Sequence, residues 1–305
     1  MISFDSVSKF VLSDITVHIP QGKSVGLIGV SGAGKTTFLK LACGLLEPEA
    51  GKVFTMRKNP VADRRKIGRD CSVLFTDKPF LQKEDTVYEN FEMLRSIYDL
   101  REEVFWKDYT ELSERLGFQS FEKEMVKNLS LGQRRRAELG AALLHRPGLL
   151  LLDEPASGLD EKAKREFQKI LEERKKEDTM TILLTSHDMT EISRLCDRIL
   201  FLHEGKLLFY GEEETLRRTF LPQDEMTLKV AGGMPDLEDL PLQVYSFDGE
   251  ILRLVYRSDT ITAAEILQFL LKKNVVAEVS IRKPKLEEIV ARLAGGEEQR
   301  GKERK

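Results

Sequence analysis

The sequence has few of the features that mark secreted, membrane-spanning or nucleic-acid-binding chains. Its 305 residues include only three cysteines and no CxxC spacing, which argues against a disulfide framework and a zinc site. No apolar run approaches the roughly eighteen residues that span a bilayer, and MISFDSVSKF lacks the basic start and apolar core of a signal peptide. The formal net charge of -3 gives no global footprint for nucleic acid. We therefore expect a cytoplasmic globular protein with no direct nucleic-acid partner.

What the sequence does contain is an alternation of apolar strands and amphipathic helices. Apolar runs at 24–28, 149–152 and 180–185 predict strands buried on both faces, and helical periodicity marks 161–176 and 190–196. Strands that alternate with helices favour a mainly parallel sheet, and a charged, helix-rich insertion interrupts this pattern. The sequence thus predicts an α/β core that is split by a helical subdomain.

The pattern of predicted strands and helices changes after Phe220. Strand-like stretches at 242–245, 251–256 and 277–281, with helices at 262–273 and 286–293, predict a small α+β unit in the order β-β-α-β-α. The predicted domains are an α/β domain at 1–220 with its helical subdomain at about 78–142, a small α+β C-terminal domain at 221–294, and a frayed tail at 295–305.

A glycine-rich loop follows the strand at 24–28 and precedes a helix. Its sequence, GVSGAGKT from Gly29 to Thr36, matches the phosphate-binding pattern G-x-x-x-x-G-K-[ST] in the required strand–loop–helix context. Backbone N–H groups and the helix N-terminus would hold phosphate oxygens, Lys35 would reach the β and γ phosphates, and Thr36 would offer a hydroxyl to Mg²⁺. The predicted nucleotide-binding residues of this segment are Gly29, Ser31, Gly32, Gly34, Lys35, Thr36 and Thr37.

Two adjacent carboxylates end the buried strand LLLLDEP. Carboxyl ends of parallel strands are where open α/β sheets bind ligands. Asp153 would hold the hydration shell of Mg²⁺, and Glu154 would polarise a water molecule for attack on the γ-phosphate.

Three further motifs complete a family pattern. The peptide LSLGQ at 129–133 resembles the signature of ATP-binding cassette (ABC) ATPases, SGLD at 157–160 resembles their D-loop, and TSHD at 185–188 resembles their switch-histidine segment. The resemblance covers about residues 1–215 and implies a P-loop NTPase cassette that binds ATP and Mg²⁺. It implies that two cassettes sandwich two ATP molecules, and because one chain carries every motif we expect a homodimer.

The resemblance also implies roles for particular residues. Ser130 and Gly132 would contact the γ-phosphate bound to the opposite cassette, and His187 would contact the γ-phosphate near Glu154. The nucleotide-binding residues expected from the signature and D-loop motifs are Ser130, Gly132, Gln133 and Asp160.

The sequence departs from the family pattern at two places and leaves one residue open. Leu131 stands where the signature has glycine. The position of the glutamine that contacts Mg²⁺ falls on Asp77, whose carboxylate suits a metal, whereas Gln82 lies five residues later and is the alternative. Phe10 is a candidate to stack on adenine, with a plain core role as its alternative.

The triplet Arg134–Arg136 follows the signature directly, and we expect it on a helix surface rather than in a nucleic-acid site.

The C-terminal VSIRKPKLEEIVARL resembles the extension of cassettes that serve bacterial exporter permeases. The resemblance therefore implies an ATPase subunit that powers a membrane exporter, held at the inner face of the cell membrane by an integral permease chain. The alternative is a soluble cassette ATPase that acts in translation or on nucleic acid.

Overall fold

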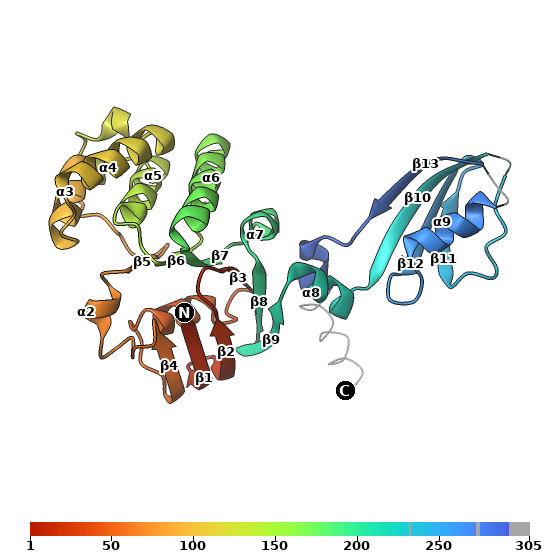
Figure 1. Ribbon diagram of the computed structural model, residues 1–305, viewed down its shortest axis with the longest axis horizontal. Coiled ribbons are helices and arrows are strands. Elements are labelled where there is room, and N and C mark those ends of the chain that lie inside the picture. The colour runs from red at the N-terminus through yellow and green to blue at the C-terminus, as the bar shows by residue number, and fades with distance from the viewer. Residues whose placement is uncertain (232, 273–274, 293–305) are drawn as a thin grey trace. The chain divides into compact units, whose positions relative to one another are not determined.

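The computed structural model describes residues 1–231, 233–272 and 275–292 and divides the chain into two compact units (Figure 1). The first unit runs from Met1 to Gly211, and the second begins at Glu212. Among the described residues, the first unit contains two sheets and the second unit one, and each unit has its own apolar core. Among the described residues, no helix combines the length and the apolar character needed to cross a membrane.

A six-stranded sheet forms the centre of the first unit. Its strands lie in the order β5-β6-β7-β3-β8-β9, all parallel except for the antiparallel edge pair of β8 and β9. Every residue of β3, β6 and β7 is buried, as expected for strands covered on both faces. The bounds are β3 Ser24–Ile28, β5 Cys71–Leu74, β6 Leu149–Asp153, β7 Thr181–Thr185, β8 Arg198–His203 and β9 Lys206–Gly211.

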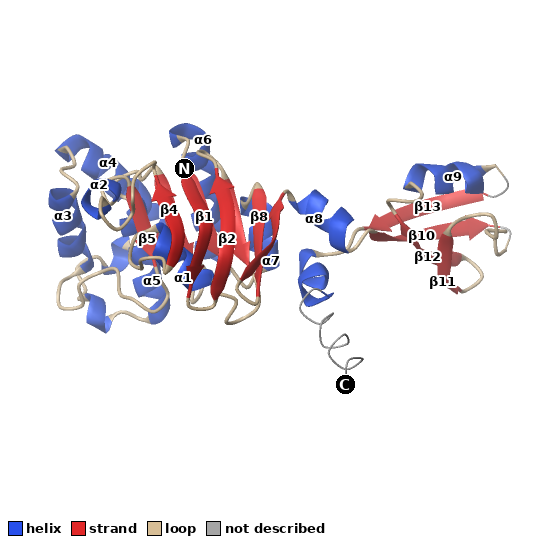
Figure 2. Ribbon diagram, turned by 90° about the horizontal axis from the view of Figure 1, so that it is seen from below, coloured by secondary structure: helices blue, strands red, loops and turns tan. Residues whose placement is uncertain are grey.

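A second, three-stranded antiparallel sheet in the order β2-β1-β4 shares its core with one face of the large sheet. Helix α1, Lys35–Ala42, belongs to this core, and the ring of Phe38 stacks on that of Phe4 with centroids 4.1 Å apart. The strands are β1 Ile2–Lys9, β2 Leu12–Ile19 and β4 Ala50–Thr55 (Figure 2). The loop that precedes α1 is therefore held between a fully buried strand and a helix whose apolar residues are buried.

Helices cover the other side of the sheet and form the insertion. Aromatic rings of Phe91, Tyr109 and Phe118 pack together at centroid separations of 5.0 to 5.9 Å and join α3 to α4. The helices on this side are α3 Val87–Ile97, α4 Glu102–Leu116, α5 Leu131–Leu143, α6 Glu161–Asp178 and α7 Met189–Leu195, with 3-10 turns at Gln119–Phe121 and Val126–Asn128. The short helix α2, Arg64–Ile67, lies on the opposite side, where Ile67 belongs to the core shared with the second sheet (Figure 1).

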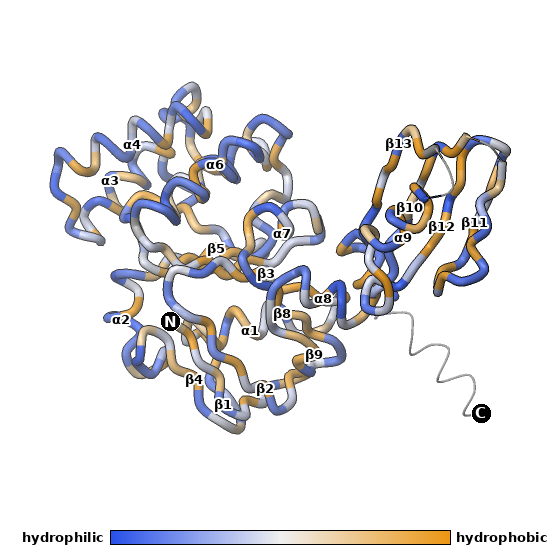
Figure 3. Tube along the Cα trace, turned by 45° about the vertical axis from the view of Figure 1, so that its right-hand side comes forward, coloured by the Kyte–Doolittle hydropathy of each residue, from blue (hydrophilic) through white to orange (hydrophobic). Residues whose placement is uncertain are grey.

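The second unit is a four-stranded antiparallel sheet in the order β11-β12-β10-β13 with α9 packed on one face. Its core joins alternate residues of β10 and β12 to Ile266 and Leu270 of α9, and Figure 3 shows apolar residues concentrated along these strands. The bounds are α8 Glu213–Phe220, β10 Gln223–Ala231, β11 Leu242–Phe247, β12 Ile251–Arg257, α9 Ala263–Leu271 and β13 Val275–Arg282, and residues 286–292 are helical.

The predicted α/β core with its helical insertion is confirmed, and β6, β7, α6 and α7 begin and end within two residues of their predicted positions. The predicted order of the second unit is incomplete, because α8 and β10 were missed. The sequence of β10, QDEMTLKVA, is largely polar and does not predict a strand, although Met226, Leu228 and Val230 alternate into the core. The predicted helix ends at 273 and 293 and the tail at 295–305 lie outside the described residues.

Candidate functional site

The loop between β3 and α1 has the backbone conformation that its glycines predict. Gly32 and Gly34 adopt left-handed φ angles of 81° and 101°, which residues with a Cβ rarely adopt. A Cβ on Gly34 would also come within 2.5 Å of Leu12 Cδ2. Because α1 begins at Lys35, the free N–H groups of its first turn join those of the loop in an anion-binding element.

The side chain of Lys35 bridges back across this loop. Its ammonium donates to the carbonyl oxygens of Gly29 at 2.8 Å and Val30 at 3.2 Å. Burial lowers the pKa of Lys35, and the nearby carboxylates of Glu154 and Asp153 oppose that effect. The loop thus holds a cation against weak neutral acceptors that phosphate oxygens can replace.

Asp153 ends β6 beside the start of α1. Its Oδ2 accepts from the Thr36 hydroxyl at 3.1 Å, and its Oδ1 accepts from the Thr185 hydroxyl at 2.7 Å. Mg²⁺ prefers such hard oxygen ligands and retains several waters, so the Thr36 and Asp153 oxygens fit it. Within the described part of the chain, no group of three or more His, Cys, Asp or Glu side chains could hold a metal ion.

Glu154 follows directly and has a left-handed φ of 48°, which is uncommon for a residue with a side chain. Its Oε2 accepts from the His187 backbone N–H at 3.2 Å, while Oε1 lies 3.3 Å from His187 Nε2 and is buried without accepting a hydrogen bond. An unoccupied carboxylate oxygen is what a general base needs in order to accept a proton.

These groups line one cavity of about 480 Å³, a size typical of small-molecule sites. Of the seven predicted loop residues, all but Gly29 line this cavity. The two predicted carboxylates, the histidine and Asp77 line it as well. The lining residues are Val11, Ser31, Gly32, Gly34, Lys35, Thr36, Thr37, Thr76, Asp77, Asp153, Glu154 and His187. Sequence reasoning missed Val11 and Thr76; Thr76 donates its hydroxyl to the Asp153 carbonyl oxygen at 2.7 Å.

The two candidates for the metal-contacting position lie in different surroundings. Asp77 lines the cavity and its Oδ2 lies 3.6 Å from Lys40 Nζ. Gln82 is exposed, does not line the cavity, and uses its backbone N–H to bond Asn90 Oδ1 at 2.7 Å. The geometry therefore favours Asp77.

Phe10 lies in the turn between β1 and β2, with a φ of 53° and its side chain 67% exposed. The alternative of a core phenylalanine is therefore wrong. The neighbouring Val11, rather than Phe10, lines the cavity, and the Lys9 ammonium lies 4.8 Å from the centroid of the Phe10 ring. An exposed aromatic ring next to the cavity wall is available to stack on a base.

The signature residues do not line this cavity. Ser130 is exposed and caps α5, with its hydroxyl accepting from Gln133 N and its own N–H donating to Gln133 Oε1. A Cβ on Gly132 would approach Gly158 O at 2.8 Å, so the signature helix packs closely on the D-loop. Within one chain, the helix start that carries Ser130 is thus an exposed anion-binding element separate from the Lys35 cavity.

Asp160 has a structural task in this chain. It caps α6 by accepting from Ala163 N at 2.8 Å, and it forms an ion pair with Arg136 of α5. This pair joins the signature helix to the end of the D-loop.

The expectation for the arginine triplet is wrong for Arg135. Arg135 is only 4% exposed. Its guanidinium donates to the backbone carbonyls of Asp153 at 3.1 Å, Glu154 at 2.8 Å and Pro155 at 3.0 Å. Arg134 and Arg136 are partly exposed, as expected. The three positions differ because consecutive residues of a helix point about 100° apart, so one of them must face the sheet.

Comparisons with known proteins agree with this geometry. A family model described as "ABC transporter" matches residues 12–157. The chain is 33% identical over 215 residues to the ABC transporter ATP-binding protein NatA of Bacillus subtilis (strain 168), covering 69% of this chain and 85% of that protein. It is 34% identical over 214 residues to the lantibiotic transport ATP-binding protein SrtF of Streptococcus pyogenes, covering 69% and 89%.

Solved structures show the same fold. A dimeric ATP-binding cassette in a post-hydrolysis state, bound to ADP and Pi, superposes with a TM-score of 0.63 at 25% identity, covering 70% of this chain and 98% of that one.

Proposed function

This chain belongs to the ATP-binding cassette (ABC) transporter family, and from this premise we propose that it is the ATPase subunit that dimerises on ATP and powers a membrane exporter. Members of this family are ATPases that bind ATP, so the family and the enzyme class expected from the motifs are confirmed. The observation that carries the proposal is that one chain holds two separate half-sites: the Lys35 cavity and the exposed helix start at Ser130.

In the proposed reaction, backbone N–H groups of the loop and Lys35 bind the phosphates of ATP. Glu154 accepts a proton from a water molecule as that water attacks the γ-phosphorus, and the bond to the bridging oxygen of ADP breaks, releasing phosphate. His187 holds Glu154 through its backbone N–H and lies beside it to contact the γ-phosphate. The proposal is supported by Glu154 Oε1, which accepts no hydrogen bond and lies 3.3 Å from His187 Nε2.

Mg²⁺ would neutralise charge on the β- and γ-phosphate oxygens, held by Thr36, Asp153 and Asp77. The Thr36 and Asp153 oxygens lie 3.1 Å apart and Asp77 lines the same cavity, which supports this set. Phe10 would stack on the adenine.

The second half-site acts in the dimer. Ser130, Gly132 and Gln133 of one copy would close over the γ-phosphate held by Lys35 of the other, and Asp160 would lie at the same interface. A complete set of motifs on one chain supports a homodimer. ATP then holds the two copies together, and its hydrolysis lets them separate.

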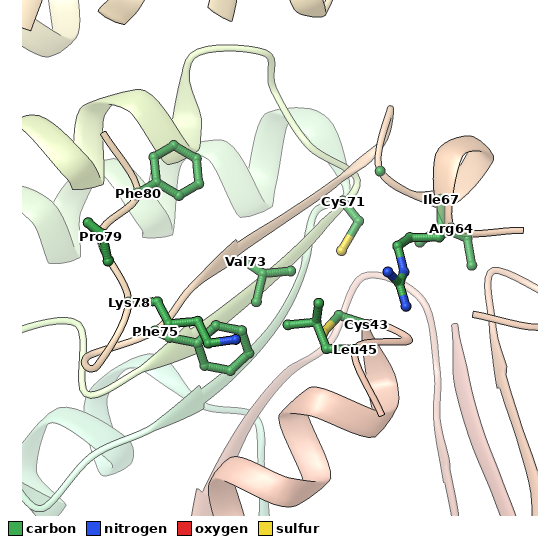
Figure 4. A pocket seen from close by; sticks show the side chains of 11 residues that line it. Cys43, Leu45, Arg64, Ile67, Cys71, Val73, Phe75, Lys78, Pro79 and Phe80 are labelled. Carbon is green, nitrogen blue, oxygen red and sulfur yellow. The ribbon is translucent and has the colours of Figure 1, made fainter. Parts of the chain in front are cut away.

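The partner would be an integral permease, and a groove in the first unit suits a helix from such a protein. This groove, of about 300 Å³, lies at the end of α1 and along the segment after β5 (Figure 4). Val73, Phe75 and Phe80 make it apolar, and Arg64 and Lys78 give it positive charge. It therefore fits a short amphipathic helix that carries an acidic residue. Through this contact the protein would lie in the cytoplasm at the inner face of the membrane.

The domain assignment belongs to the same proposal. Residues 1–220 would form the cassette, with its helical subdomain at about 78–142, and residues 221–294 a C-terminal domain. The alternative of a soluble switch is not favoured, because the relatives are transport proteins by name.

The test is to isolate the tagged chain from detergent-solubilised membranes and to identify its partner. We expect a polytopic membrane protein with the native chain and its loss with Phe80→Glu, which puts a carboxylate in the apolar groove. Phe54→Glu, on the 37% exposed Phe54 of β4, is the matched control and should keep the partner. Substrate movement out of cells, or into inside-out vesicles with ATP, gives the direction. Recovery from the soluble fraction alone, or with ribosomes or nucleic acid, would contradict the proposal.

A further inference from the structure

The backbone that carries Glu154 is held in an unusual conformation by a small number of contacts. A left-handed φ at a residue with a side chain is energetically unfavourable and persists only where the surroundings impose it. On one side, Glu154 N donates to the Thr185 hydroxyl at 3.0 Å. On the other side, the carbonyl oxygens of residues 153 to 155 all accept from Arg135.

The Arg135 side chain donates hydrogen bonds to all three of these carbonyls. The planar guanidinium presents several N–H donors at fixed angles, so it can fix the directions of three successive peptide groups at once. A lysine ammonium at the same place would keep the charge and lose the fixed fork.

Glu138 in turn orients Arg135. It lies one helical turn further along α5, is 4% exposed, and its Oε2 lies 3.4 Å from Arg135 Nη1. Its Oε1 accepts from Phe80 N at 3.4 Å, in the segment that lines the apolar groove. Burial lowers the pKa of Arg135, and the neighbouring Glu138 carboxylate opposes that effect.

We infer that Arg135 is a positioning residue for ATP hydrolysis: by holding the carbonyls of residues 153 to 155, it fixes the backbone from which Glu154 reaches the attacking water. This inference rests on the proposed function of Glu154 as the base. It differs from a purely structural role because the three carbonyls belong to the residues of the base itself. A shift of about 1 Å in such a group can reduce turnover about a hundredfold without changing substrate binding.

The experiment compares steady-state ATP hydrolysis of the full chain with Arg135→Lys. We expect kcat to fall about tenfold or more while the KM for ATP changes less than about twofold, since the loop that binds phosphate is untouched. Glu138→Gln keeps the acceptor for Phe80 N–H and loses the ion pair, so its decrease in kcat should be smaller.

The matched control is Arg174→Lys. Arg174 is also 4% exposed and bonds the buried Asp108 and the partly exposed Glu111, neither of which lines the ATP cavity. Its replacement should lower the melting temperature with kcat within about twofold of the native value. If Arg174→Lys reduces kcat as much as Arg135→Lys at equal loss of stability, the effect is structural and the inference is overturned.

A double variant separates this inference from the proposed function. If Arg135 acts through Glu154, then Arg135→Lys combined with Glu154→Gln should turn over no more slowly than Glu154→Gln alone. A further multiplicative loss would overturn the positioning role. Near-native turnover of Glu154→Gln would instead contradict the proposed base, whatever Arg135→Lys does.

Discussion

The two units of this chain are both sheets covered by helices, but they bury very different side chains. In the first unit the interior holds charged and polar groups such as Arg135, Glu138, Asp153 and Glu191, and in the described residues of the second unit only Asp224 falls in that class. Buried polar groups destabilise a fold unless they are paired, and paired groups fix the positions of the side chains and backbone that they contact. In the first unit several of them converge on the carboxyl end of β6.

The second unit lacks such a convergence. Its core is apolar, and the exposed residues of its strands alternate with buried ones in the pattern of a sheet solvated on one face. The comparison indicates that ATP chemistry belongs to the first unit.

The largest predicted effect is a difference in kcat between two acid-to-amide variants, one in each unit. Glu154→Gln removes the proton acceptor and should reduce kcat by about a hundredfold or more with ATP still bound. Asp224→Asn in the second unit should leave kcat within about twofold. Phosphate release under saturating Mg-ATP measures both, and equal losses in the two variants would remove the distinction between the units.

A smaller effect is expected within the first unit, at the position where the family pattern is broken. Asp77→Ala removes a carboxylate from the cavity and should raise the Mg²⁺ concentration for half-maximal hydrolysis several-fold, about 1 kcal/mol in binding. Gln82→Ala should leave it unchanged, because Gln82 is exposed and outside the cavity. If Gln82→Ala raises the required Mg²⁺ concentration more than Asp77→Ala does, the metal contact must be assigned to Gln82 instead.

The smallest effect concerns pH and the second unit alone. Burial raises the pKa of the Asp224 carboxyl, with Lys283 opposing and Glu214 adding to that shift. Between the ordinary aspartate pKa of about 3.9 and the raised pKa of the folded state, Asp224 is protonated in the folded chain and ionised in the unfolded chain. Its contribution to the free energy of unfolding is therefore complete below the ordinary pKa and is lost as pH rises through the folded pKa. Hydrogen exchange of β10 and β12 amides, corrected for intrinsic rates, should show protection that declines over this window. Asp224→Asn should abolish the decline, and an unchanged decline would assign it to another group.

Much of the ATP site could be predicted because its residues stand at fixed offsets from element ends. The loop Gly29–Thr36 lies between a strand and a helix, and Asp153 and Glu154 end a buried strand, so topology alone brings them together. The exposure of Ser130 at a helix start follows equally from its place as a cap.

Other features depend on contacts between distant segments, which sequence spacing does not encode. Arg135 is one of three consecutive arginines, and only the rotation of α5 against β6 decides which of them is buried. Strand β10 carries mostly polar residues, and its place in the sheet is decided by its pairing with β12 and β13. The proximity of Val11 to the cavity results from the β1–β2 turn, whereas the sequence favours Phe10 because of its aromatic ring.

The central claim is that the two half-sites of one chain are completed by a second copy around ATP. The direct measurement is the solution mass of Glu154→Gln, a chain of 34.9 kDa, with and without Mg-ATP. The account predicts a monomer without nucleotide and a dimer with it, and predicts that adding Ser130→Arg to this variant prevents the dimer while one ATP still binds per chain. A Glu154→Gln protein that stays monomeric with ATP bound, or dimers that form equally well with Ser130→Arg, would contradict it.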